Sequence, residues 1–275
     1  MSGEAGKQYH FVIMAAQRKG VVNALAEANG VSHKCLIEID GKTLIELTLK
    51  AIVDSGLARR ITISIEDETA PRSVGYVRGL MDAGAVRVVP SADNIFDSVA
   101  RALDDEAAFP AIITTADNVL FTPEMLAYFC ARAEAFDACA GMASKETLFS
   151  KYPGGQKRFH RFKDGEFTNC NIFGIMNPKA LAAAELFRSG GQFLKASRLK
   201  LIRAFGLINA IAYKYAWYPK DEAFMRIGRK FGLNVGVVDL PYPEAPIDVD
   251  NERTLGFAVD ILAARKAAGA GAPAH

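Results

Sequence analysis

Short apolar runs alternate with amphipathic stretches along the first half of the chain. The runs are rich in β-branched residues and predict buried strands over 9–15, 60–65, 85–90 and 111–115. Between them, apolar residues recur at helical spacing and predict helices over 43–55, 72–83 and 95–105. Thr122 followed by Pro123 predicts the cap and first turn of another helix. Strands that alternate with helices of this length form parallel β-α-β units, so we predict an α/β fold.

The pattern changes after Ser144. Asp164-Gly165 is a strong two-residue turn signal between two strand-like segments, 158–163 and 166–175, and it predicts an antiparallel hairpin inserted after the parallel half. Further elements are predicted as helices over 193–215, 221–231 and 252–267 and as a strand over 234–239. No internal repeat or linker interrupts the sequence. We therefore expect a single domain over 8–268, with disordered ends at 1–7 and 269–275.

Composition narrows the class of protein only slightly. The chain has 275 residues, of which 50% are hydrophobic and 23% charged, with a formal net charge of +2. These values are typical of globular proteins and favour no particular partner. The four cysteines lack C-x-x-C spacing and lie in apolar stretches, which predicts buried free thiols in a reducing compartment. Without a signal pattern or an apolar run of about 18 residues, we expect a cytoplasmic protein that does not span a membrane.

The loop after the first strand is the first candidate site. It reads Ala15-Ala16-Gln17-Arg18-Lys19-Gly20. Small residues leave room for a ligand there, and main-chain N–H groups together with cations can cradle an anion. The loop matches neither G-x-G-x-x-G, which argues against a dinucleotide fold, nor G-x-x-x-x-G-K-[ST], which excludes a P-loop. A basic loop that is merely solvated is the alternative.

Four further residues have the chemistry of a phosphate or metal site. Lys34 stands at a strand-like entry and can point at a phosphate as a fixed charge, although a surface lysine is the alternative. Asp117 follows a central parallel strand, where a carboxylate suits Mg²⁺ unless it only caps a turn. Asp248 and Asp250 lie two apart on an extended segment and so face the same way, or else cap the last helix.

In their order, these segments resemble the nucleotidyltransferase family that includes the molybdenum-cofactor guanylyl- and cytidylyltransferases and the sugar-phosphate and polyol-phosphate nucleotidyltransferases. The family's first loop, A-G-x-G-x-R or a variant, is similar to 15–20, with Gln17 where glycine is usual. Its lysine and following G-K/R-P resemble His33-Lys34 and Gly41-Lys42-Thr43, the last without the proline. T-A-D resembles 115–117, and D-x-D-T/N resembles 248–251. The resemblance spans roughly residues 11 to 260.

The resemblance implies a Rossmann-like fold of the nucleotide-diphospho-sugar transferase type, with a mixed, mainly parallel sheet flanked by helices. It also implies that an acceptor, usually a phosphate monoester, attacks the α-phosphorus of an NTP and expels pyrophosphate. A phosphate nucleophile is already anionic, so positioning and charge neutralisation suffice. Residues 11–144 would form the nucleotide-binding half and 145–268 the acceptor-binding half, with a basic helical insertion at about 190–231. CTP or GTP would be the nucleotide.

The resemblance also implies roles for individual residues. Mg²⁺ would be held by Asp117 and Asp250, and Lys34 and Arg18 would stabilise charge on the phosphates. The remaining expected ligands of the nucleotide are Ala15, Ala16, Gln17, Lys19, Gly20, Asn94 and Ser98. The acceptor is expected at Thr168, Asn169 and Asn171. Two alternatives stay open: a glycosyltransferase of similar fold, and, because the glycine loop is degenerate, a catalytically silent nucleotide-binding protein.

A basic stretch lies beyond the minimal family pattern. Residues 186–220 carry seven basic residues and no acid: Arg188, Lys195, Arg198, Lys200, Arg203, Lys214 and Lys220. Apolar residues recur at helical spacing over 193–218, so the segment is either a core helix with a solvated face or a basic amphipathic helix on an anionic membrane. The second reading suggests a lipid-linked acceptor and peripheral contact at the inner face of the membrane. Nucleic acid is not expected as a partner.

Overall fold

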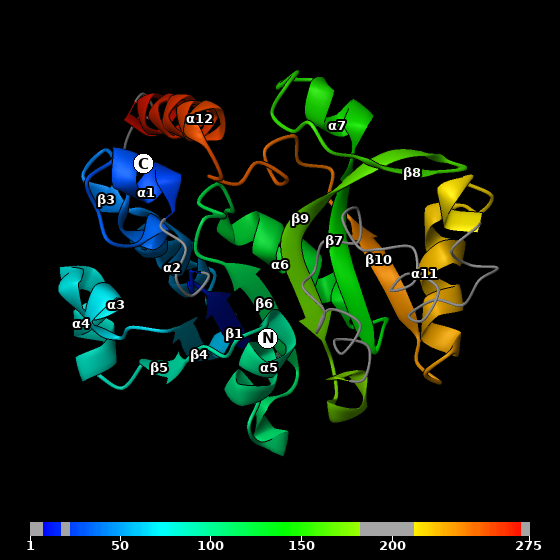
Figure 1. Ribbon diagram of the computed structural model, residues 1–275, viewed down its shortest axis with the longest axis horizontal. Coiled ribbons are helices and arrows are strands. Elements are labelled where there is room, and N and C mark those ends of the chain that lie inside the picture. Colours follow the sequence, from blue (N-terminus) through cyan, green and yellow to red (C-terminus); the bar gives the residue numbers. More distant parts are fainter. Residues whose placement is uncertain (1–7, 18–22, 182–211, 271–275) are drawn as a thin grey trace, which may run out of the picture.

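The computed structural model describes residues 8–17, 23–181 and 212–270. An eight-stranded sheet forms its centre, in the order β10-β7-β9-β6-β1-β4-β5 with β8 paired to β9 (Figure 1). The strands are β1 (Tyr9–Met14), β4 (Ala58–Ile65), β5 (Val86–Pro90), β6 (Ala111–Thr115), β7 (Ala138–Ser144), β8 (His160–Phe162), β9 (Gly165–Ile175) and β10 (Val235–Asp239). A second, two-stranded sheet pairs β2 (Glu38–Ile39) with β3 (Lys42–Thr43). The predicted mixed, mainly parallel α/β sheet is confirmed.

Helices cover both faces of the main sheet. The described helices are α1 (Ala24–Ala28), α2 (Leu44–Asp54), α3 (Thr69–Ser73), α4 (Gly75–Asp82), α5 (Ile95–Ala102), α6 (Pro123–Ala133), α7 (Lys145–Phe149), α11 (Lys220–Arg229) and α12 (Glu252–Ala270). Short 3₁₀ turns are η1 (Lys34–Leu36), η2 (Glu106–Ala108) and η3 (Pro178–Ala180). Along β1, Phe11 and Ile13 pack in one core with α2 and α6, whereas Val12 packs in another with α5. This alternation follows from the strand's two-residue side-chain period.

Within the described residues, the helix predictions hold except for one break; most of the helix predicted over 193–215 lies outside them. Thr122 caps α6 as expected, and Thr43 caps α2, each accepting an N–H of the first turn; Gly56 follows α2 with a φ of 66°. The helix predicted over 72–83 is instead two helices, α3 and α4. Val74 between them is extended and buried, because its side chain joins the core under the sheet. The helical spacing of apolar residues over 72–83 continues across Val74, so the sequence did not indicate this break.

The hairpin predicted around Asp164-Gly165 is confirmed as β8 and β9, but its place in the sheet was not foreseen. β9 is not an appendage: it lies between β6 and β7 and pairs antiparallel with both. β7 itself was not predicted from the sequence. Because β6 and β7 both run opposite to β9, the carboxyl ends of β1, β4, β6, β7 and β10 share one edge of the sheet, where ligands of such folds bind.

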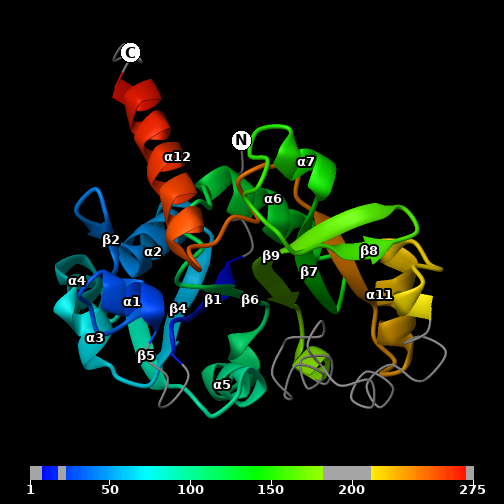
Figure 2. The same cartoon turned by 45° about the horizontal axis from the view of Figure 1, so that its top comes forward.

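The C-terminal helix packs against elements from the first half of the chain. Ala258 and Ile261 of α12 share a buried cluster with Leu25 of α1 and Leu44 of α2, and Figures 1 and 2 show α12 lying over these elements. α12 continues to Ala270, so the prediction of disorder is wrong for residues 269 and 270, which are helical. The other tail positions, 1–7 and 271–275, lie outside the described residues. Among the described helices none is both long and apolar enough to cross a bilayer.

Candidate active site

Asp117 is fixed at the carboxyl edge of the sheet by a hydrogen-bonded turn after β6. The hydroxyl of Thr115 donates to its Oδ1, and the Ala116 carbonyl accepts from the Thr48 hydroxyl at 3.1 Å. The Asn118 amide donates to the main-chain carbonyl oxygens of Cys170 and Asn171 on β9, at 3.3 and 3.1 Å. Asp117 is 8% exposed. The turn therefore presents one carboxylate at the point where the antiparallel strand meets the parallel half.

Asp248 and Asp250 reach the same point from the far end of the chain. The main-chain N–H of Val249, between them, donates to the Asp117 carbonyl at 3.1 Å. One carboxylate oxygen of each aspartate lies within 4.8 Å of the others. Neither aspartate caps α12, because Asn251 does so: its Oδ1 accepts the N–H of Thr254 at 3.2 Å. Both carboxylates are thus left to the site.

Lys34 stands among these carboxylates. Its ammonium pairs with Oδ2 of Asp117 and lies 2.8 Å from Oδ1 of Asp250. Burial opposes the charged ammonium, yet the two carboxylates outweigh burial and raise the pKa of Lys34 above its ordinary value. Lys34 begins the 3₁₀ turn η1 rather than a strand, which corrects the predicted strand-like entry. The predicted meeting of Lys34, Asp117 and Asp250 is present in the structure.

Asp248 has the most unusual environment of the three. It is buried and accepts hydrogen bonds from the Gln156 amide on Oδ1 and the Asn171 amide on Oδ2, each 2.8 Å long. Burial, and then the charges of Asp117 and Asp250, raise the pKa of Asp248 to about 7. Gln156, which also donates to the Pro246 carbonyl, has no sequence signature and was not predicted.

A cluster of this composition suits a hard divalent cation. Carboxylate oxygens are the ligands that Mg²⁺ prefers, and here three carboxylates cluster, two of them paired with the Lys34 ammonium. Burial is the main reason why the pKa of Asp248 is raised, and the negative charges of Asp117 and Asp250, which Lys34 offsets only in part, raise it further. The donor set therefore fits the Mg²⁺ expected from the sequence.

The residues expected to bind the acceptor do not all face this cluster. Asn171 reaches Asp248, and its amide oxygen accepts from the Asn169 side chain at 3.2 Å. Both are partly exposed, and Asn171 has a φ of 51°. Thr168 is only 4% exposed, so on β9 it belongs to the alternating buried positions rather than to the open ones. The structure thus places Asn169 and Asn171, but not Thr168, on the accessible side.

The residues predicted to bind the nucleotide lie only in part within the described chain. Ala15 and Ala16 follow β1 at the carboxyl edge, with Ala16 exposed. Asn94 caps α5 through the N–H of Asp97 at 2.9 Å, and the Ser98 hydroxyl is buried between Ala92 and Asn94. Their polar groups are already used internally, so contact with a base stays a prediction. Arg18, Lys19 and Gly20 lie outside the described residues.

The basic stretch is described only from residue 212 onward. Lys220, counted with it in the sequence, is not a surface cation: it is 2% exposed and its ammonium lies 2.7 Å from Asp221 and 3.1 Å from Asp239. Tyr215 and Trp217 are exposed and stack with ring centroids 6.2 Å apart. Most of the predicted amphipathic helix, 193–211, lies outside the described residues.

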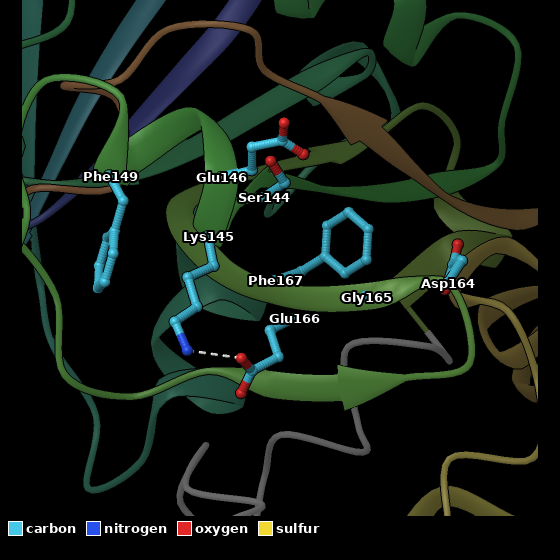
Figure 3. Close-up of a pocket in the computed structure, with 8 residues that line it drawn as sticks. All are labelled: Ser144, Lys145, Glu146, Phe149, Asp164, Gly165, Glu166 and Phe167. Atoms are coloured by element: carbon cyan, nitrogen blue, oxygen red, sulfur yellow. Dashed lines mark hydrogen bonds and ion pairs between the residues drawn. The ribbon is translucent and has the colours of Figure 1, made fainter.

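A cavity of about 360 Å³ lies between α7 and the β8–β9 hairpin (Figure 3). Its lining includes Phe149, Phe167 and the Lys145–Glu166 ion pair, 2.6 Å long, but none of the three aspartates. Ser144 and Phe167, both in the lining, are paired positions of β7 and β9. The cavity is thus separate from the carboxylate cluster. It lies at the start of β9, the strand that also carries Asn169 and Asn171.

Solved structures share this fold. A hypothetical transferase from Thermus thermophilus superposes with a TM-score of 0.71 at 21% identity, covering 90% of this chain and 99% of its own. A 4-diphosphocytidyl-2C-methyl-D-erythritol synthase from Anaerococcus prevotii gives 0.54 at 12% identity, covering 94% and 99%. A CMP:2-keto-3-deoxy-manno-octonic acid synthetase complexed with CTP gives 0.56 at 12% identity, covering 94% and 100%. At these identities the likeness concerns the fold alone. No curated protein sequence matches the chain significantly.

The sequence itself matches a family. The model of the MobA-like NTP transferase domain matches residues 21–205, more than half of the chain. The match begins after β1 and includes Lys34, Asp117 and the strand that carries Asn169 and Asn171. Together with the sheet order and the carboxylate cluster at its carboxyl edge, the match shows that the chain belongs to the family of MobA-like NTP transferase domains and is a nucleotidyltransferase.

Proposed function

We propose that this nucleotidyltransferase is Mg²⁺-dependent and transfers a nucleotidyl group from an NTP to an acceptor phosphate, releasing pyrophosphate. The observation that carries the proposal is the cluster of Asp117, Asp248 and Asp250, in which the Lys34 ammonium pairs with Asp117 and Asp250. Asp117 and Asp250 would hold the metal, with Asp248 beside them. When bound, Mg²⁺ supplies positive charge to the reacting phosphate oxygens. A single domain over 8–268 is part of the same proposal.

The protein's own groups would position the phosphates and balance their charge. Lys34 would exchange a carboxylate partner for the α-phosphate, since its long side chain and three N–H donors allow it to turn. Arg18 would act on the leaving pyrophosphate. Ala15 and Ala16 offer main chain without bulk at the end of β1, where the nucleotide would lie. No general base is required, because an acceptor phosphate is anionic before it attacks.

The substrates are proposed on narrower grounds. CTP and GTP are the favoured nucleotides, and CTP has support from the synthetase of the same fold that was solved with CTP. The acceptor would be a sugar or polyol phosphate, or a lipid-linked phosphate, approaching along β9. Asn169 and Asn171 support this direction because they are partly exposed and Asn171 adjoins the carboxylate cluster.

Two measurements test the proposal. A thermal-shift screen with the four NTPs and Mg²⁺ should show stabilisation by one NTP, because a ligand bound only to the folded state raises its stability. Pyrophosphate release is then measured with that NTP and a panel of phosphate monoesters. Mg²⁺-dependent release of pyrophosphate supports the proposal. Chelation of Mg²⁺ should stop the release without unfolding the protein. Binding without release for every acceptor favours the silent protein, and turnover only with NDP-sugars favours the glycosyltransferase.

We also propose peripheral contact with an anionic membrane through 193–218. The exposed, stacked rings of Tyr215 and Trp217, with the Lys214 ammonium 5.0 Å from the Tyr215 centroid, combine the aromatic and basic groups that favour a lipid interface. Co-sedimentation with vesicles that contain anionic lipid tests it. Binding at low salt that is lost in a Trp217→Ser variant supports the contact, and no binding at low salt overturns it.

A further inference from the structure

Four residues beside Lys34 form a closed ring of contacts. The Gln17 side-chain amide donates to the Ser32 carbonyl at 2.8 Å, and the Ser32 hydroxyl bonds Nδ1 of His33 at 2.9 Å. Nε2 of His33 lies 3.5 Å from a carboxylate oxygen of Glu66, and both oxygens of Glu66 accept the main-chain N–H of Gln17 at 3.1 Å. The ring joins the ends of β1 and β4 to the residues that immediately precede Lys34.

We infer that Gln17 and Glu66 are positioning residues that hold Lys34 at the phosphate site. The inference rests on the proposed function, in which Lys34 contacts the nucleotide. Gln17 acts at the carbonyl of Ser32, two residues before Lys34, and Glu66 acts at His33, the residue next to it. Neither side chain needs to touch the nucleotide for this role.

The local structure shows why Lys34 requires such ties. It opens the three-residue turn η1, and the cap residue of that turn, His33, makes no side-chain capping bond. Two backbone bonds, from the N–H of Leu36 to His33 and of Ile37 to Lys34, hold the turn internally. A turn this short is weakly stable by itself. Its position relative to β1 and β4 therefore depends on contacts made by other elements.

Gln17 supplies a contact that its main chain cannot make. Any residue at this position could donate its N–H to Glu66, but only a side chain with a donor reaches the Ser32 carbonyl. A methionine has similar length and bulk and lacks the donor, so Gln17→Met removes this bond while keeping the shape. Glu66→Gln keeps an acceptor for the Gln17 N–H but removes the negative charge that faces His33.

Hydrogen–deuterium exchange tests the ring without any substrate. In the ligand-free full chain, Gln17→Met should speed exchange of the Leu36 and Ile37 amides about threefold to tenfold, and Glu66→Gln should have a smaller effect in the same direction. Glu68→Gln, an exposed carboxylate two residues from Glu66, is the matched control and should leave these rates unchanged. Unchanged rates in both ring variants, with folded protein shown by circular dichroism, overturn the inference.

A double-mutant cycle tests whether Gln17 acts through Lys34. Gln17→Met should weaken binding of the Mg²⁺–NTP found in the thermal-shift screen about threefold to tenfold, and the same change in a Lys34→Ala background should cost less than about twofold. An equal loss in both backgrounds means that Gln17 acts on the nucleotide directly and overturns the positioning role. If the wild-type protein binds none of the four NTPs, the proposed function fails instead. The exchange rates still show whether the ring of contacts holds the turn at Lys34.

Discussion

The side-chain amide of Asn171 donates to Oδ2 of Asp248 at 2.8 Å, across 77 positions of the chain. This bond joins β9 to the segment before α12 and brings Asn171, which is proposed to bind the acceptor, against the carboxylate cluster. The cluster concentrates negative charge that Lys34 only partly neutralises, and that imbalance motivates the first two predictions.

Replacing Asp117 by Asn should abolish turnover with little loss of folding. The change removes one charged oxygen ligand and leaves a side chain of similar size, so we expect pyrophosphate release to fall by roughly 10²-fold or more. Asp260→Asn, an exposed position on α12, is the control and should keep full activity. Unchanged turnover in Asp117→Asn would refute the metal assignment.

Lys34→Met should make folding stability depend on Mg²⁺. Without the ammonium, the three carboxylates repel one another, and we expect the Mg²⁺-free protein to lose about 1–3 kcal/mol. Mg²⁺ should restore more stability to this variant than to the wild type in thermal unfolding. Lys50→Met removes a surface pair with Asp54, 3.1 Å long, and should behave like the wild type. An Mg²⁺ shift of equal size in Lys34→Met and the wild type would contradict this account.

His10 should make the protein sensitive to mild acid. It is fully buried on β1, and burial, followed by the charges of Arg60 and Arg87, lowers the pKa of His10 to about 4. The unfolded chain binds this proton near pH 6.5, so the contribution is present above pH 6.5 and is lost as the pH falls toward 4, by up to about 3 kcal/mol. Urea unfolding between pH 4.5 and 7.5 measures it. His10→Asn should flatten the pH dependence whatever its overall stability, and an unchanged slope would assign the acid sensitivity to other groups.

Two helical glycines should respond oppositely to alanine. A Cβ at Gly228 in α11 would stand 2.4 Å from the Leu233 carbonyl oxygen and 2.8 Å from the Val235 main-chain nitrogen, so Gly228→Ala must displace backbone and should cost about 2 kcal/mol or more. A Cβ at Gly256 in α12 meets nothing within 4 Å. Gly256→Ala should therefore stabilise by about 0.5–1 kcal/mol. Chemical denaturation measures the change in the free energy of unfolding for both variants. A change of the same sign in both would be inconsistent with the packing described.

The strands that could be predicted carry their own signal. Runs such as Phe-Val-Ile at 11–13 are apolar because both faces of a parallel sheet are buried. β7 lacks this signal, since its residues are mostly small. A Cβ at Gly141 would lie 2.4 Å from the Ile172 side chain, so β7 has small residues because β9 packs closely against it. That reason exists only once the two strands are adjacent.

The residues of the candidate site also fall into those that could be predicted from the sequence and those that could not. Lys34, Asp117 and Asp250 were recognisable because charged residues beside apolar strands form ordered motifs. Gln156 and Glu66 were not, because their partners, Asp248 and Gln17, are 92 and 49 positions away. The burial of Lys220 could not be predicted for the same reason: its ion pair with Asp239 forms only when α11 packs on β10.

By itself, then, the sequence determined the α/β class, the cap of α6, the hairpin and the identity of the central charged residues, because these depend on the periodicity and chemistry of neighbouring positions. Only the tertiary structure decided that β9 enters the middle of the sheet, that Asp248 is buried among acids with a raised pKa, and that Gln17 is tied to the residues before Lys34. These are properties of contacts between distant segments, where burial and charge are set by what packs alongside and not by the local sequence.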